Sequence, residues 1–297
     1  MNYALDPANA LPDEIRRVAC EQLDDAISRL TESDDPFDVR VHEARKRTKE
    51  VRAVLRLVRK PLGASREQAQ NQRLRDAARR LAPARDAEVA RATLTTLDRG
   101  ASDLARLRKA LEAERDSARA SVAGAGIAAE VASELADLRQ EAEAWPLPSA
   151  GWALIAPGFA RTYRRGLWRM REAYADPSDA ALHEWRKRVK DHWCHLRLVS
   201  PAFPMALEPF AEVAHRLSDV LGDHHDLSVL ARTVEQTDVD LSTRARDRLE
   251  RRLGDRREEL RGQAWDLGLR LYGPKPKAWT GVVGSWWVAT RRVRGTS

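Results

Sequence analysis

The sequence predicts an all-α protein made of two related halves, and three observations lead to this prediction. Alternating runs of Val, Ile and Thr, which are typical of half-buried strands, are missing. Ala, Leu, Arg and Glu dominate instead, with apolar residues recurring at helical spacing. A segment that begins at His42 recurs 141 residues later, from His183. A repeat over that distance indicates duplication of a unit of several helices.

The helices are expected in two groups separated by a break. Pro146, Pro148 and Gly151 interrupt the helical pattern, so the segment "AWPLPSAG" is predicted to link halves at about 5–145 and 150–272. Helix signals place the predicted helices, in chain order, near residues 10–31, 37–60, 65–82, 85–98, 101–120, 127–144, 152–174, 178–200, 206–222, 225–236 and 242–271.

The C-terminal tail, residues 273–297, differs from the rest of the chain. It is basic and mixes Gly, Pro, Trp and Arg without a clear period, so we expect it to be loosely ordered. Trp286 and Trp287 are large apolar side chains, and they predict that the tail docks on the rest of the protein.

The composition indicates a basic globular protein. Of 297 residues, 43% are hydrophobic and 33% charged, and 52 Lys and Arg against 45 Asp and Glu give a net charge of +7, which favours polyanionic partners. Two cysteines, Cys20 and Cys194, are too few for a disulfide framework and suit a reducing compartment. No run of about 18 apolar residues and no secretory leader stand out, so we expect a cytoplasmic protein without a membrane partner.

The repeated segment is a basic helix. It reads "HEARKRTKEVRAVLRLV" from His42 and "HEWRKRVKDHWCHLRLV" from His183. At about 100° per residue, one face of each copy gathers cations and the opposite face gathers apolar side chains. The apolar faces hold Ala44, Val51, Leu55 and Val58 in the first copy and Trp185, Val189, Leu196 and Val199 in the second. The cationic faces, with no interleaved acid, hold His42, Arg45, Lys46, Lys49 and Arg56, and His183, Arg186, Lys187, Lys190 and Arg197.

Such a face destabilises its own helix, because like charges three or four residues apart repel by a few tenths of a kcal/mol per pair. An anionic ligand would compensate for this repulsion. The alternative interpretation is a solvated charged surface, and the histidine at the same position in both copies argues against it.

A second pair of segments follows the basic helices. "RLRDAARRLAPARDAEV" at 73–89 aligns with "VAHRLSDVLGDHHDLSV" at 213–229. Asp86 and Asp226 follow Pro83 and Gly222, so each is predicted to stand at a helix start in a structural role.

These paired motifs resemble the CHAD domain, the conserved histidine α-helical domain. The family's pattern of an apolar residue, His, Arg-Lys and Lys stands here as "VHEARKRTK" (41–49) and "LHEWRKRVK" (182–190). "LAPARDAEV" (81–89), "LGDHHDLSV" (221–229) and "GFARTYRRG" (158–166) are similar to further family segments. Departures are the small Ala44 and Thr48 on the core side, and His224-His225 in place of Arg-Asp.

The resemblance covers about residues 5–272 and implies a fold and a function. It implies two four-helix bundles related by a pseudo-two-fold axis, with a basic groove or pore formed by both motif copies. It also implies binding of inorganic polyphosphate and targeting to polyphosphate granules. The CYTH triphosphate-tunnel domain, often fused to CHAD domains, has no candidate segment, so we expect a non-catalytic, stand-alone binder without a cofactor or metal.

The predicted phosphate contacts are the ten residues of the two cationic faces. Weaker candidates are expected at the rim of the groove, namely Arg52, Arg75, Arg79, Arg161 and Arg165. Lys offers a point charge and Arg a planar fork for phosphate oxygens. A dimer is compatible with the sequence.

Two rival functions stay open. "GDHHD" (222–226) is similar to metal-dependent phosphohydrolases, but His224 and His225 would point about 100° apart on a helix. The cationic faces would also attract a nucleic-acid backbone, although the first copy has no aromatic residue for base stacking, and Trp185 and Trp193 of the second are expected on the packed side. His192 and His195 are predicted to be packing residues.

Overall fold

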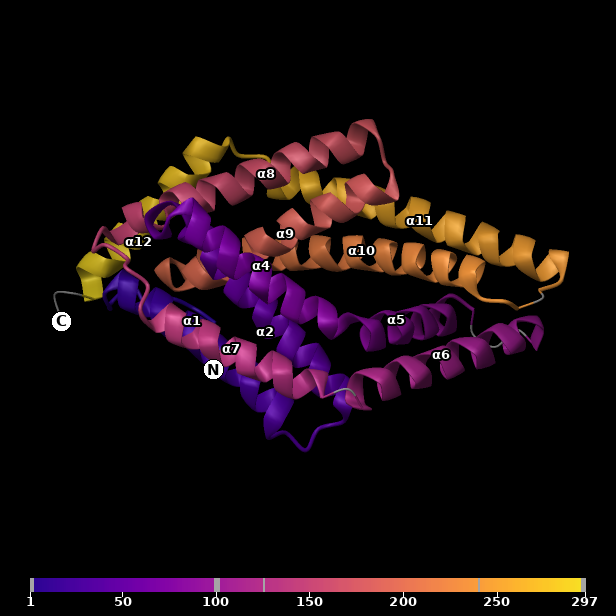
Figure 1. Ribbon diagram of the computed structural model, residues 1–297. Helices are drawn as coiled ribbons and strands as arrows, with labels where there is room; N and C mark the ends of the chain where they lie inside the picture. The colour runs from indigo at the N-terminus through magenta and orange to yellow at the C-terminus, as the bar shows by residue number, and fades with distance from the viewer. Residues whose placement is uncertain (1–2, 99–101, 125, 240, 295–297) are drawn as a thin grey trace.

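The computed structural model describes residues 3–98, 102–124, 126–239 and 241–294, without the side chains of 82–86, 102, 119 and 121–124. Within these ranges every regular element is a helix (Figure 1), so the all-α prediction is confirmed. The α-helices are α1 (Leu11–Thr31), α2 (Phe37–Leu57), α3 (Arg59–Leu62), α4 (Ala64–Arg80), α5 (Ala82–Leu97), α6 (Ala105–Gly124), α7 (Ile127–Glu143), α8 (Ala156–Ala175), α9 (Asp179–Val199), α10 (Pro204–Gln236), α11 (Thr243–Leu271) and α12 (Pro276–Arg294). Short 3₁₀ turns are η1 (Ser102–Leu104), η2 (Gly151–Leu154) and η3 (Ser200–Ala202).

Helix α9, which carries the second copy of the repeated motif, illustrates how the sequence sets its helix ends. The Ser178 hydroxyl accepts a hydrogen bond from the Ala181 backbone N–H at 3.3 Å and caps the start. Asp179 in the first turn and Arg197 in the last complement the helix dipole. The apolar face predicted from the repeat is buried in both copies, including Trp185 and Val51.

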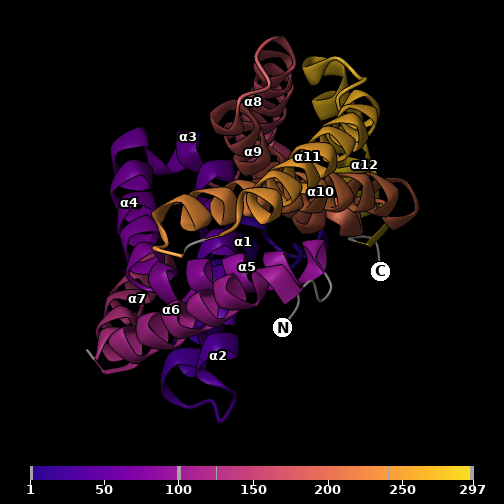
Figure 2. The same cartoon turned by 90° about the vertical axis from the view of Figure 1, so that its right-hand side faces the viewer.

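The helices form two groups. Helices α1, α2, α4 and α7 pack in a ring, each against the next, while α8, α9, α10 and α11 pack successively along the chain. The hairpins α5–α6 and α10–α11 project to the same side of the molecule (Figures 1 and 2), and α5 packs against α10. No helix in the described ranges is long and apolar enough to cross a membrane.

Helix α10 corrects the prediction of two helices at 206–222 and 225–236. It is continuous from Pro204 to Gln236, so Asp226 lies inside a helix and not at its start. In the first half, the corresponding stretch is divided into α4 and α5, with Pro83 in the first turn of α5. Proline lacks a backbone N–H and clashes with the preceding turn, whereas Gly222 in α10 costs only about 1 kcal/mol. The side chain of Asp86 lies outside the described residues.

Helix α12 corrects the prediction of a loosely ordered tail. Trp279, Val283 and Trp287 repeat every four residues and are at most 5% exposed. They pack on α8 and on the turn η2, where Trp287 lies 6.1 Å from Trp152 between ring centroids. Docking of the tail, which Trp286 and Trp287 predicted, therefore takes the form of a helix.

The two groups of helices meet at a close junction between α2, α8 and α9. An added Cβ at Gly158 would overlap the backbone carbonyl of Leu57, so only glycine allows α8 to approach the end of α2 this closely. The ring Nε2 of His195 donates to the backbone oxygen of Ala53 at 2.8 Å. These contacts place the two copies of the repeated motif side by side.

Candidate functional site

Lys49 lies where the two cationic faces meet. Burial among protein atoms lowers its pKa to about 7, and four further cations contribute to the shift. Arg45 and Arg52 belong to its own helix, whereas Arg186 and Lys190 come from α9. The structure therefore brings cations from both copies of the motif to one place.

Lys49 is exposed at the surface, although neighbouring protein atoms desolvate its ammonium group. Lys190 is likewise desolvated, and its ammonium lies 4.8 Å from the ring centroid of Trp193. The guanidinium of Arg186 lies against Gly222, where an added Cβ would be 3.4 Å from its Nε. Two helices, α9 and α10, thus position this cation.

Two arginines of the predicted faces are paired across the junction. Arg56 of the first copy contacts Asp191 of the second at 3.1 Å, and Arg197 of the second contacts Glu50 of the first at 2.7 Å. Glu50 and Asp191 occupy the same position in the two copies, one residue after Lys49 and Lys190. Each copy therefore supplies a carboxylate that holds an arginine of the other.

The expectation of cationic faces without interleaved acid is wrong. Glu43 forms an ion pair with Lys46 at 3.3 Å, and Glu184 pairs with Lys187 at the same position of the second copy. Both glutamates lie outside the central arc of the helical wheel, so the pattern of that arc did not reveal them. Both lysines are about two-fifths exposed, so their pairs are weak.

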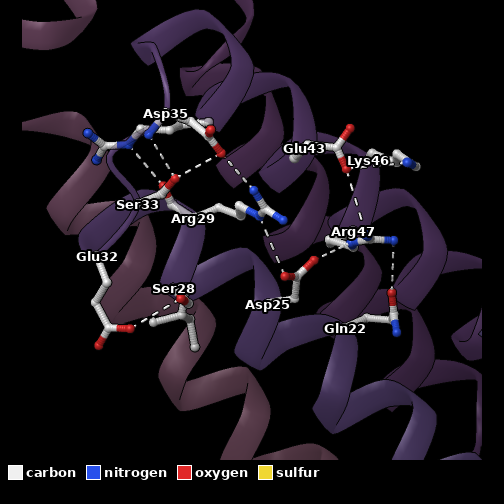
Figure 3. A network of polar contacts seen from close by, with 12 residues as sticks. Gln22, Asp25, Ser28, Arg29, Glu32, Ser33, Asp35, Glu43, Lys46 and Arg47 are labelled. Atoms are coloured by element: carbon white, nitrogen blue, oxygen red, sulfur yellow. Dashed lines mark hydrogen bonds and ion pairs between the residues drawn. The ribbon is translucent and has the colours of Figure 1, made fainter. Parts of the chain in front are cut away.

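Arg47 and Arg188, also repeated between the copies, have structural surroundings. Figure 3 shows Arg47 among Asp25, Gln22 and Glu43, and Glu50 forms a further ion pair with it at 2.9 Å. Arg188 forms an ion pair of 2.9 Å with Asp191, the carboxylate that also holds Arg56. These arginines fix the carboxylates on which the site is built. Sequence reasoning did not single them out, although their repetition was a signal.

The two motif histidines lie in different environments. His42 is exposed on α2. His183 is half-buried and its ring lies against that of His225 of α10, with centroids 4.2 Å apart and planes tilted by 35°. Burial and the neighbouring cations lower the pKa of His183, and that of His225 falls to about 3, so both rings are neutral near pH 7. His224 is buried and points toward Asp179, 4.0 Å away.

The rim candidates fall into two sets. Arg52 donates to Asn71 at 2.9 Å, and burial beside Arg56 and Arg75 lowers its pKa to about 10. Arg161 and Arg165 also have lowered pKa values, because they are partly buried near Arg188 and other arginines. The remaining two, Arg75 and Arg79, are exposed on α4, and each lies within 4.0 Å of the Asp76 carboxylate of the same helix. Asn71 was missed because an amide gives no charge signal in the sequence.

The predictions for the histidines and tryptophans of α9 can be compared with the burial of these residues. His192 and His195 are fully buried, and burial lowers their pKa values to about 3 and 4, so the prediction of packing residues is confirmed. Trp185 is buried as predicted. Trp193 is only partly buried, but it packs against the hydrophobic core, in agreement with its predicted place on the packed side. It lines a cavity of about 350 Å³ together with Arg197, His215 and Glu208.

Among the residues that the structure describes, no group of three or more His, Cys, Asp or Glu side chains could hold a metal ion.

Comparison with known proteins gives a family and a fold. A family model of the CHAD domain matches residues 14–235. The crystal structure of the CHAD domain from the plant Ricinus communis aligns with a TM-score of 0.61, covering 97% of this chain and 94% of that one at 17% sequence identity. At this identity the likeness concerns the fold. No curated protein matched the sequence.

Proposed function

The chain belongs to the CHAD domain family, and from this premise we propose that it binds inorganic polyphosphate through the cationic surface around Lys49. The observation that carries the proposal is the convergence of Arg45, Arg52, Arg186 and Lys190 on one lysine. Cations held this close repel one another, and a string of phosphates relieves the repulsion.

Polyphosphate is a repeating anion without bases, so its recognition depends on charge density and phosphate geometry. Lysine ammonium groups supply mobile donors, and arginine forks supply two parallel hydrogen bonds. Arg56 and Arg197 are held by internal carboxylates, which reduces the side-chain entropy that ligand binding would otherwise cost.

We further propose that the two halves arose by duplication and are related by an approximate two-fold axis. The reciprocal pairs Arg56–Asp191 and Arg197–Glu50 support this proposal, because a two-fold interface repeats each contact with its partners exchanged. The groove so formed would be non-catalytic and would serve a cytoplasmic protein that associates with polyphosphate granules.

The test is charge reversal at the four cations that converge from both copies. Replacing Arg45, Lys49, Arg186 and Lys190 with Glu should abolish polyphosphate binding and leave helicity by circular dichroism unchanged. A matched control reverses four exposed cations on α6 and α11 and should bind as the wild type does, with the substitutions at Arg106, Lys109, Arg246 and Arg251. An equal loss of polyphosphate binding in both variants would show that only the net charge of the protein matters, and it would refute a specific site.

Salt and competition distinguish the ligands. Wild-type affinity should fall steeply with salt, with a slope of about −0.7 per neutralised phosphate by analogy with single-stranded nucleic acids. RNA and DNA should displace labelled polyphosphate less well per phosphate; equal displacement would favour a nucleic-acid backbone as the ligand of this surface. Phosphate release with and without a chelator tests the hydrolase alternative.

A further inference from the structure

Helix α8 carries an outward stripe of cations interrupted by one aromatic ring. Its inner face, including Phe159, is buried, whereas Arg161, Arg164, Trp168 and Arg171 follow one another along the outer side. Their spacing of three, four and three residues keeps them within about 80° on the helix, over a length of about 15 Å. Figures 1 and 2 show α8 at the upper edge of the molecule, away from α10 and from the α5–α6 hairpin.

The arginines of this stripe are not neutralised by the described part of the chain. Arg161, Arg164 and Arg171, and Arg165 beside them, have no carboxylate oxygen within 4.0 Å among the described residues. This contrasts with the neighbouring Arg169, which pairs with Glu172 at 2.6 Å. An unpaired cluster of this kind attracts an anion.

Electrostatics support the same interpretation. The pKa of Arg161 is lowered by partial burial and by Arg59, more than Glu67 raises it. The pKa of Arg165 is lowered by burial and by Arg188. The guanidinium groups around α8 therefore repel one another in the free protein, and phosphates bound there would relieve this.

Trp168 gives the stripe a second property. Trp168 is 54% exposed, whereas Trp145, Trp185, Trp279 and Trp287 are at most 5% exposed. The guanidinium of Arg169 lies 4.9 Å from its ring centroid, which orients the indole and leaves much of it open. An exposed indole among arginines is suited to stacking with a planar heterocycle.

We propose that the outer face of α8 binds single-stranded nucleic acid, with a base stacked on Trp168 and phosphates on Arg161, Arg164 and Arg171. Stacking on aromatic side chains within a basic track is how such ligands are bound without sequence preference. An anionic membrane surface fits less well, because interfacial helices present a broad apolar face and this stripe has one aromatic residue. The inference does not depend on polyphosphate binding.

The experiment measures binding of a labelled single-stranded RNA of about twelve nucleotides to the full chain. Trp168→Ala should weaken binding about tenfold, as expected for loss of one stacked base, and Trp168→Phe should retain most of the affinity. Arg164→Glu with Arg171→Glu should abolish it. Met205→Ala, at a residue 85% exposed elsewhere on the surface, should change nothing. Polyphosphate has no base, so Trp168→Ala should bind it within twofold of wild type.

An oligonucleotide with abasic sites provides a measurement on the wild-type chain. It should bind about tenfold more weakly than the intact RNA, and Trp168→Ala should remove that difference. Equal binding of intact and abasic strands by the wild type would overturn the proposal. The proposal would also be overturned if Trp168→Ala lost binding to anionic vesicles but still bound RNA as the wild type does. Equal losses for RNA and polyphosphate would show that Trp168 is only structural. If RNA binds as described and polyphosphate does not bind, this inference stands and the proposed function fails.

Discussion

Lys49 should couple polyphosphate binding to the uptake of a proton. Its pKa is lowered to about 7 by burial and by Arg45, Lys190, Arg186 and Arg52, in that order of effect. Near pH 7 about half of the free molecules therefore carry a neutral amine at the centre of the site. A bound phosphate favours the ammonium form and raises the pKa of Lys49 again.

The lowered pKa of Lys49 determines the direction and the size of the pH dependence of polyphosphate affinity. Below pH 7 Lys49 is charged before and after binding, so its contribution to affinity is fully present. Above pH 7 the amine must first take up a proton, and the contribution is lost at up to tenfold per pH unit. If the bound-state pKa rises by about two units, affinity should be about tenfold lower at pH 8 than at pH 6.

The measurement is polyphosphate affinity between pH 6 and 9 for wild type and Lys49→Arg. Arginine stays protonated throughout this range, so the variant should bind with a flatter pH profile. Protonation of the ligand and of other side chains affects both proteins equally, so it cancels when the two pH profiles are subtracted. Proton uptake at pH 7, measured by calorimetry in buffers of different ionisation enthalpy, should be about half a proton for wild type and smaller for the variant. Identical profiles would refute the lowered pKa of Lys49 and the proton uptake that follows from it.

Two further predictions concern stability, measured by chemical denaturation. Glu50→Gln should lower the free energy of unfolding by about 3–5 kcal/mol, because Glu50 is 2% exposed and its carboxylate holds two arginines. Glu184→Gln, at an exposed ion pair, should change the free energy of unfolding by at most about 1 kcal/mol. Similar values for the two variants would contradict the buried network. Gly158→Ala should lower the free energy of unfolding by about 3 kcal/mol, because the added Cβ would overlap the carbonyl of Leu57. Gly254→Ala, inside α11 with open space around it, should raise the free energy of unfolding by about 1 kcal/mol. A neutral Gly158→Ala would show that α8 can shift away from α2.

The helices were largely predictable, because their apolar spacing depends on local sequence alone. The predicted helix boundaries were wrong where the effect of one residue type on a helix had been judged incorrectly. Gly222 was interpreted as a break although a helix tolerates one glycine, while Pro83 does end a helix because it removes a donor. In α12 the spacing of Trp279, Val283 and Trp287 was a helix signal that the glycines and valines around it obscured.

The site was predictable only in part, because its geometry depends on how helices pack. The repeat identified the cations around Lys49, but no pattern within one copy predicts that Glu50 and Asp191 would each reach an arginine of the other copy. The contact of His183 with His225 likewise depends on the packing of α9 against α10. Exposure of Trp168 cannot be inferred from spacing, since aromatic residues on amphipathic helices are usually buried.

The exchanged ion pairs have a consequence for synthesis of the protein. During translation α2 leaves the ribosome long before α9, and in that interval Arg56 and Glu50 face water without their later counterparts. The nascent N-terminal segment therefore lacks the carboxylate of Asp191 that later pairs with Arg56. If the surface around Lys49 binds polyphosphate as proposed, that surface is complete only after the C-terminal helices have docked.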